Sequence, residues 1–331
     1  MFAERKAIEI FNKFVRKLKV NIKLAIRKAK RVSFIGLYGV PVYDVVALFI
    51  QGIVKGSITT RASAVAFNFF VAIFPTLIFF FTLIPYVPIA NFQAQLLVLV
   101  QGVLPTSAFN MVEHTLVEVV TQRSWGLLSF GFIGAVFFAH NGISSLIDAF
   151  NATFHVIGRR TFVNQHLIAF MLTFLLPFLL VISVVLVFFG QTILDFFVQK
   201  QMLQLNFTYY IIVVIRWVAI IMLFFISISF LYYMAPARKI KFHFISAGSI
   251  MATAMILVTS IGFSFYVNNF GQYNKLYGSI GSLLALMFWL FFNAVGLIVG
   301  FEINASIASA KNNLNVRALN DEYSENIGNQ K

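Results

Sequence analysis

Long apolar segments separated by short polar ones dominate the pattern of this chain. Six of them come close to the roughly 20 residues that a helix needs to cross the hydrocarbon layer of a bilayer. They lie at about residues 62–88, 126–147, 167–190, 210–234, 245–267 and 281–308. The pattern therefore predicts an all-α, polytopic membrane protein with a six-helix transmembrane domain over residues 55–310.

A shorter apolar segment at residues 33–54 precedes the first span and could be read as a seventh. Pro41 and Asp44 lie inside it. A crossing here would also place Lys55 and Arg61 on the side of the membrane opposite to the other basic loops. We therefore expect an interfacial or partly buried helix.

The first 31 residues have a different pattern, with apolar residues at three- and four-residue steps and Lys and Arg on the other face. This is typical of an amphipathic helix on an anionic membrane surface. Nucleic-acid binding is the alternative for such a basic segment, but no aromatic-and-basic stacking module accompanies it. We expect residues 1–54 to form basic cytoplasmic helices whose partners are anionic membrane lipids, and we expect no nucleic-acid partner.

Two further regions flank the spans. Residues 89–125 contain an apolar stretch too short to cross alone and the helix-breaking Pro105, and they predict an outer loop made of two helices. Residues 311–331 are polar and rich in Asn, and they predict a disordered cytoplasmic tail.

Composition and charge agree with this class and orient it. Apolar residues make up 60% of the chain and charged residues 11%, against about a quarter charged in soluble domains. The chain has no Cys, which excludes disulfides and thiolate metal sites. The formal net charge is +14, and 13 of the 25 Lys and Arg lie at or before Arg61. Placing this basic head inside predicts that both termini are cytoplasmic.

Candidate chemistry lies where polar residues enter the spans. A charged residue marks the predicted cytoplasmic boundary of each span. Asn68 lies seven residues after Arg61, His140 lies eight residues before Asp148, and Glu302 lies nine residues before Lys311. These separations correspond to on the order of 10–13 Å of helix. Three spans then place polar groups at one depth, which predicts a shared pocket near the inner face. Arg61 and the two arginines at 159–160 are the expected partners of Glu302.

Arg216 lies about two turns from the outer end of its span, roughly 9 Å deep, so we expect its partner on the outer side. An inner carboxylate and an outer arginine suit a path for an anionic or zwitterionic molecule. Each candidate also has a structural interpretation. Glu302 could be half of a buried ion pair, Arg216 could extend to water along its stem, and His140 could hydrogen-bond a neighbouring helix.

Motifs of soluble enzymes are missing from the sequence. It has no Walker loop, no G-x-S-x-G, no H-E-x-x-H and no His/Asp metal cluster, so we predict no enzyme activity, no catalytic residue, no cofactor and no metal. The turn from Gly278 to Gly281 could offer its amides to an anionic headgroup or simply begin the last span. Gly296 and Gly300 predict close approach of two helices.

Several short motifs together resemble the YihY/BrkB family of bacterial inner-membrane proteins over about residues 55–310. Where many members have Trp-small-small-Gly in the second span, this chain has His140 followed by Asn141 and Gly142, so a His-dependent mechanism is not expected across the family. The resemblance implies six inner-membrane helices with cytoplasmic termini. The segments that carry it are Arg61–Phe67 with Phe74-Pro75, Asn141-Gly142, Phe150-Asn151, Arg160–Phe162, Tyr233–Pro236, Tyr273–Gly281 and Gly300–Ala305.

These observations predict a protein that transports or flips an anionic lipid or other amphiphile at the cell envelope without ATP. A non-transporting scaffold for envelope enzymes is the alternative. A ribonuclease label carried by the family is a third, but the clustered carboxylates or His that phosphodiester cleavage uses are missing. The candidate pathway residues are Asn68, His140, Asn141, Arg216, Tyr273, Asn274, Tyr277, Gly278, Gly281, Glu302 and Asn304.

Overall fold

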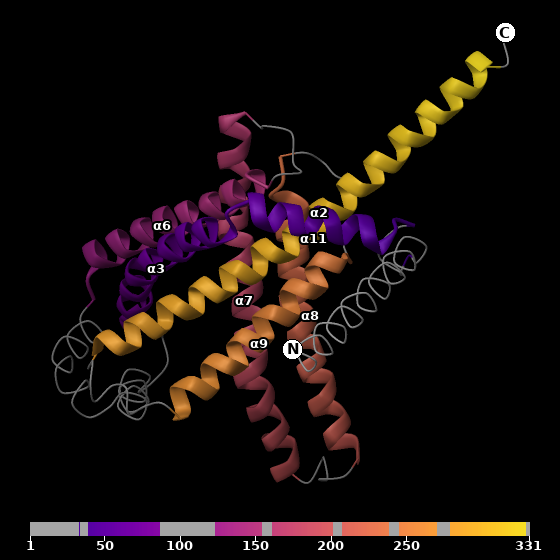
Figure 1. The fold of residues 1–331 in the computed structure, drawn as a ribbon. Coiled ribbons are helices and arrows are strands. Elements are labelled where there is room, and N and C mark those ends of the chain that lie inside the picture. The colour runs from indigo at the N-terminus through magenta and orange to yellow at the C-terminus, as the bar shows by residue number, and fades with distance from the viewer. Residues whose placement is uncertain are drawn as a thin grey trace, which may run out of the picture.

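The computed structural model describes residues 33, 39–86, 123–153, 161–200, 207–237, 245–269 and 279–328. Regular structure within these ranges is entirely helical (Figure 1). The helices are α2 (Val42–Lys55), α3 (Ile58–Leu83), the short 3₁₀ helix η1 (Ile84–Tyr86), α6 (Trp125–Asn151), α7 (Phe162–Gln199), α8 (Phe207–Met234), α9 (Ala247–Asn269) and α11 (Ser279–Gly328).

Six of the described helices are long and apolar enough to cross a membrane, which confirms the predicted all-α membrane class. The segments are close to those expected from hydropathy, for example Ile58–Tyr86 for residues 62–88 and Trp125–Asn151 for residues 126–147. Helix α2 has 14 residues and is too short to cross. The cytoplasmic position of the two termini stays a prediction.

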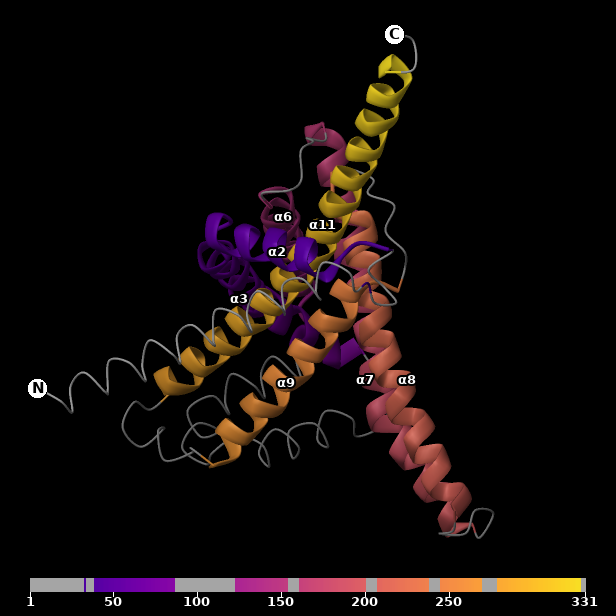
Figure 2. The ribbon, with the colours of Figure 1, turned by 45° about the vertical axis from the view of Figure 1, so that its right-hand side comes forward.

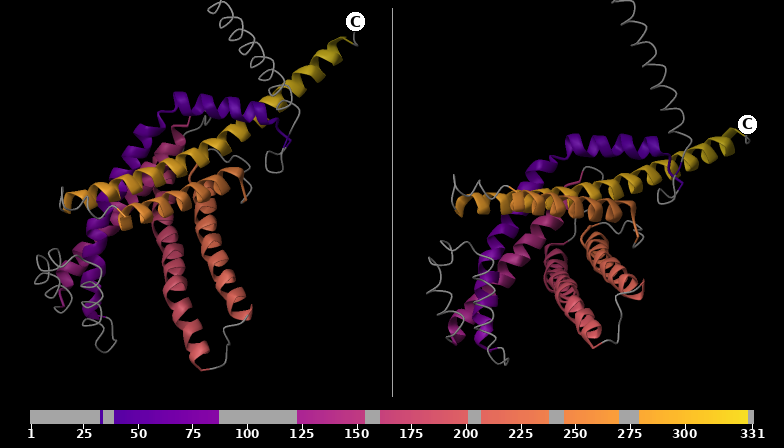
Figure 3. Two further views of the ribbon diagram at one scale, coloured as in Figure 1. Left: turned by 60° about the horizontal axis from the view of Figure 1, so that its bottom comes forward. Right: turned by 90° about the horizontal axis from the view of Figure 1, so that it is seen from below.

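The six spans pack in a ring in which α3 contacts α6, followed by α7, α8, α9 and α11, and α11 returns to α3. Helices α3 and α6 lie side by side, as do α9 and α11, while the α7–α8 hairpin extends away from both pairs (Figures 1 and 2). Helix α2 lies across α11, which is the longest of the described helices and continues beyond the bundle (Figure 3). The ring brings residues from both ends of the sequence together.

The buried core gathers at one end of the spans, where α3, α7 and α9 begin, α6 and α8 end, and α11 passes Glu302. We call this the packed end. The rings of Phe150, Tyr232 and Phe301 meet there, with centroids 4.4–5.8 Å apart. Toward the opposite ends of the same helices large apolar side chains are exposed, such as Phe130 at 70% and Phe265 at 64%. Exposed apolar surface on long helices fits contact with lipid chains.

Glycines bring α9 and α11 into close contact. A Cβ added at Gly248 would overlap the carbonyl oxygen of Gly300, and a Cβ added at Gly300 would lie 2.5 Å from the carbonyl oxygen of Gly248. Gly296, one turn away, lies against Met255 in the same way. The expectation that Gly296 and Gly300 allow close helix approach is confirmed.

The polar segment after Lys311 is helical, because α11 continues to Gly328. The predicted disorder of residues 311–331 is therefore wrong as far as residue 328. Leu314 packs against the small cluster formed by Val40, Val45, Ile307 and Ala310. A helix that is already formed extends at little cost through residues such as Ala, Leu and Arg, and this outweighed the polar, Asn-rich composition.

Three predicted features lie outside the described residues. They are the amphipathic helix within residues 1–31, the outer helices within residues 89–122, and the motif before the last span that contains Tyr273, Asn274, Tyr277 and Gly278.

Candidate functional site

A groove of about 450 Å³ lies between α3 and α6 at the packed end of the bundle. Its polar side chains come from both helices, and alanines fill the rest of its surface. The polar lining residues are Arg61, Asn68, Asn141, Ser144, Ser145 and Asp148.

The lining residues recur at helical spacing, so each helix presents one face to the groove. On α6 the series runs from Asn141 through Ser144 and Ser145 to Asp148. On α3, Arg61 and Asn68 lie two turns apart. Each helix therefore carries a polar strip along a span that is otherwise apolar.

The strip extends deep into the span. Asn68 lies ten residues after the first residue of α3, Ile58, and Asn141 lies ten residues before the last residue of α6, Asn151. Ten residues correspond to about 15 Å of helix. Because α3 and α6 have 26 and 27 residues, the polar strip runs from the packed end nearly to the middle of both helices.

Beyond Asn68 the two helices close on each other. A Cβ added at Gly142 would lie 3.2 Å from the ring of Phe69, and one added at Gly134 would lie 3.1 Å from Pro75. Near the far end, a Cβ at Gly131 would lie 2.9 Å from the backbone nitrogen of Phe79. These close contacts end the groove near the middle of the span.

Hydrogen bonds use only part of the groove's polar capacity. Asn68 donates its amide to the carbonyl oxygen of Ala64 on its own helix at 2.9 Å, and Gln165 of α7 donates to Asp148 Oδ1 at 2.6 Å. Within the described part of the chain, the side chains of Asn141 and Ser145 have no hydrogen-bond partner. Their donors and acceptors are therefore available to a bound molecule.

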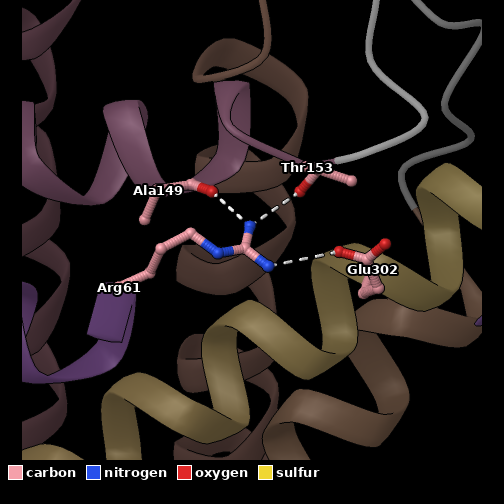
Figure 4. A network of polar contacts seen from close by, with 4 residues as sticks. All are labelled: Arg61, Ala149, Thr153 and Glu302. Atoms are coloured by element: carbon pink, nitrogen blue, oxygen red, sulfur yellow. Dashed lines mark hydrogen bonds and ion pairs between the residues drawn. The ribbon is translucent and has the colours of Figure 1, made fainter. Parts of the chain in front are cut away.

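An ion pair lies behind the groove (Figure 4). Arg61 Nη2 is 3.7 Å from Glu302 Oε2, and the exposed fractions of the two side chains are 9% and 0%. Arg61 Nη1 donates to the carbonyl oxygen of Ala149 at 2.7 Å and to Thr153 Oγ1 at 3.2 Å. The expected pairing of Glu302 with Arg61 is confirmed, and the pair joins α3, α6 and α11.

Helix α2 covers this ion pair with two glycines. A Cβ added at Gly52 would overlap the carboxylate of Glu302, and one added at Gly56 would lie 2.6 Å from Arg61 Nη2. These two glycines were not among the residues predicted from the sequence. Their four-residue spacing, which is typical of close helix contacts, was the signal available.

His140 faces α7, not the groove. Its Nε2 lies 3.1 Å from His166 Nδ1 and 3.5 Å from Ser144 Oγ, and the two imidazole rings stack at 5.3 Å. Of the three residues expected to share a pocket, only Asn68 lines this groove, together with Asn141, which follows His140 in the sequence. His140 and Glu302 do not line it. Equal depth did not place these residues on the same face of the bundle, because adjacent helical positions point about 100° apart.

The other candidates lie elsewhere. The stem of Arg216 packs against Gly190 of α7, and its guanidinium lies 5.8 Å from the ring centroid of Trp217. Asn304 accepts from the backbone N–H of Gly248 at 2.9 Å and donates to Ser246 Oγ at 2.8 Å, so it fastens the start of α9 to α11. Gly281 lines a separate, mainly apolar groove of about 540 Å³ between α9 and α11.

Comparison with known proteins identifies several relatives of this chain. It is 32% identical over 255 residues to the ribonuclease-like protein YfkH of Bacillus subtilis, an alignment that covers 76% of this chain and 90% of that protein. A UPF0761 membrane protein of Alteromonas mediterranea is 24% identical over 271 residues, which are 82% of this chain and 90% of that protein. Another, from Pseudoalteromonas atlantica, is 22% identical over 260 residues, or 78% and 84% of the two chains.

No solved structure matches this chain. The family described as virulence factor BrkB matches residues 49–322. That range includes all six helices able to span a membrane and every residue of the groove. The chain is a multi-pass membrane protein, and it belongs to the virulence factor BrkB family.

Proposed function

We propose that this protein transports or flips an amphiphile, in the first place a membrane lipid, by way of the groove between α3 and α6. The observation that carries the proposal is the polar strip from Asp148 to Asn68 and Asn141, which reaches the middle of an otherwise apolar span. Polar groups at that depth are costly in lipid. A headgroup that passes along the strip would exchange water for amide and hydroxyl partners.

The surroundings of the groove suit a molecule with one polar and one apolar end. Phe67, next to Asn68, is 58% exposed on the outside of the bundle. A headgroup could lie against the polar strip while its acyl chains stay in the bilayer. The volume of about 450 Å³ lies within the range of roughly 300–1,000 Å³ that is usual for small-molecule sites.

The proposal involves neither ATP nor bond cleavage by the protein. The sequence has no nucleotide-binding motif. Within the described ranges, no group of three or more His, Asp or Glu is placed to hold a metal ion, so a ribonuclease activity of the kind suggested by the name of the Bacillus relative finds no support in these residues. The amphiphile would move down its own concentration gradient, or its transport would be coupled to the gradient of another solute.

Reconstitution tests the proposal. Liposomes that contain the purified protein and an acyl-labelled fluorescent phospholipid are treated with dithionite, which does not cross the membrane and bleaches only the outer leaflet. We expect complete bleaching with the wild type and about half in protein-free liposomes. Asn68→Leu should slow transfer about tenfold, the equivalent of roughly 1.4 kcal/mol for a lost polar contact.

Asn293→Leu is the matched control. Asn293 also donates to a carbonyl oxygen of its own helix, that of Trp289 at 2.6 Å, but it does not line the groove. It should leave transfer unchanged. If wild-type liposomes bleach like protein-free ones, or if the two Asn variants behave alike, the groove is not a transport path. Absence of any transfer would favour a scaffold function.

A further inference from the structure

The charges at the groove do not cancel. Its cation, Arg61, is turned toward Glu302, and the two opposite charges lie 3.7 Å apart in the protein interior. Asp148 is exposed at the mouth of the groove, and its partner is the neutral amide of Gln165. Within the described part of the chain no cation pairs with Asp148. The described residues therefore give the groove a net negative charge toward a ligand.

Arg61 is poorly placed to bind a phosphate. Its side chain is only 9% exposed, and its Nη1 already donates to Ala149 and Thr153. A headgroup with negative charge alone would meet the carboxylate of Asp148 without a free cation beside it. Like charges that are brought together repel each other.

We propose that the groove selects amphiphiles whose headgroup carries a primary ammonium, the class of zwitterionic aminophospholipids; this rests on the proposed function. The carboxylate of Asp148 accepts a charge-assisted hydrogen bond from the ammonium. Ser145, about one turn or 5 Å deeper, and Asn141 beyond it offer neutral donors to the phosphate. One helical turn is the scale of the two-carbon link between the ammonium and the phosphate in such a headgroup. The sequence predicted an anionic lipid or other amphiphile as cargo, and this proposal selects a zwitterionic amphiphile over an anionic one.

Comparing the transfer rates of lipids with different headgroups in proteoliposomes tests the selection. Three acyl-labelled lipids are compared in the bleaching assay: phosphatidylethanolamine, its N-acetyl derivative, in which the ammonium is capped, and phosphatidylglycerol. We expect the wild type to move phosphatidylethanolamine about tenfold faster than the other two, because a hydrogen bond between two charged groups is stronger than one between neutral groups. Asp148→Asn should bring this ratio close to one while transfer continues.

Two control variants keep the test independent of folding. Asp148→Glu keeps the charge and should keep the preference for phosphatidylethanolamine. Asp44→Asn removes a carboxylate from α2, which lies on α11 and outside the groove, and should also leave the ratio unchanged. Monodisperse elution in size-exclusion chromatography shows that each variant is folded.

The outcomes separate the two proposals. If no lipid moves in any liposome, transport itself is refuted. If all three lipids move at equal rates in the wild type, or if the preference survives in Asp148→Asn, the selection by Asp148 is overturned while transport by the groove stands. Preference lost in Asp148→Asn and kept in Asp148→Glu is the result that the charge arrangement predicts.

Discussion

Gly52 of α2 lies directly against the buried carboxylate of Glu302 on α11, so close that even a methyl group at position 52 would overlap it. One turn further, Gly56 lies against the guanidinium of Arg61. The two glycines let α2 close over the ion pair that joins α3, α6 and α11. A helix that does not cross the membrane thus completes the packed end of the helices that do.

Gly52→Ala should destabilise the protein. The added methyl group must displace α2 or the Glu302 side chain, and overpacking of this kind costs about 1–3 kcal/mol. Gly126→Ala is the matched control, because a Cβ added at that helical glycine meets nothing within 4 Å. Thermal unfolding of the detergent-solubilised protein should show a lower Tm for Gly52→Ala alone. Equal Tm values would mean that α2 is not held against Glu302.

The Arg61–Glu302 pair should show strong coupling. Removing one partner leaves the other charged and buried, at a cost of about 3–5 kcal/mol. The double variant Arg61→Gln/Glu302→Gln should therefore be less destabilised than the sum of its single variants. Thermal unfolding of the four proteins gives the coupling energy.

A second cycle provides the control for this coupling. Arg123 donates to the carbonyl oxygen of Pro85 at 3.2 Å, near the opposite end of the bundle. Arg123→Gln combined with Glu302→Gln should be additive within roughly 0.5 kcal/mol. If the Arg61 cycle were equally additive, the ion pair would not hold the packed end together.

Gly248→Ala should loosen the α9–α11 pair. Its added Cβ would overlap the carbonyl oxygen of Gly300, which is backbone and cannot move aside as a side chain can. We expect a loss of about 1–3 kcal/mol, read as a lower Tm. Gly262→Ala on the same helix, where a Cβ meets nothing within 4 Å, should be neutral. A similar loss in both variants would point to a general effect of Ala in α9.

The sequence was sufficient for the membrane class and for one important contact. Hydropathy located the six spans because helix length in a bilayer is set by the membrane thickness. Arg61 could be named as one of three expected partners of Glu302, because a buried carboxylate requires a nearby cation and these arginines lie on the same predicted side of the membrane. Gly296 and Gly300 indicated close packing because small residues at four-residue spacing allow it.

The direction in which side chains point could not be predicted from depth alone. His140 and Asn141 are adjacent, yet one faces His166 of α7 and the other faces the groove, because that depends on which helices become neighbours. The series Asn141, Ser145 and Asp148 was readable as a polar face of one helix, but only the packing of α3 against α6 turns it into a groove.

Reversible blocking of the groove is the most direct test of transport along it. Because the chain has no Cys, Ala64→Cys places a single thiol in the groove lining. Ile133→Cys places one on the lipid-exposed surface of α6, where Ile133 is 67% exposed. Each variant is labelled with a bulky methanethiosulfonate reagent, reconstituted, and assayed for lipid transfer before and after a reductant removes the label. We predict that transfer stops in labelled Ala64→Cys, returns on reduction, and is unaffected in Ile133→Cys. Undiminished transfer in fully labelled Ala64→Cys would contradict the groove as the path.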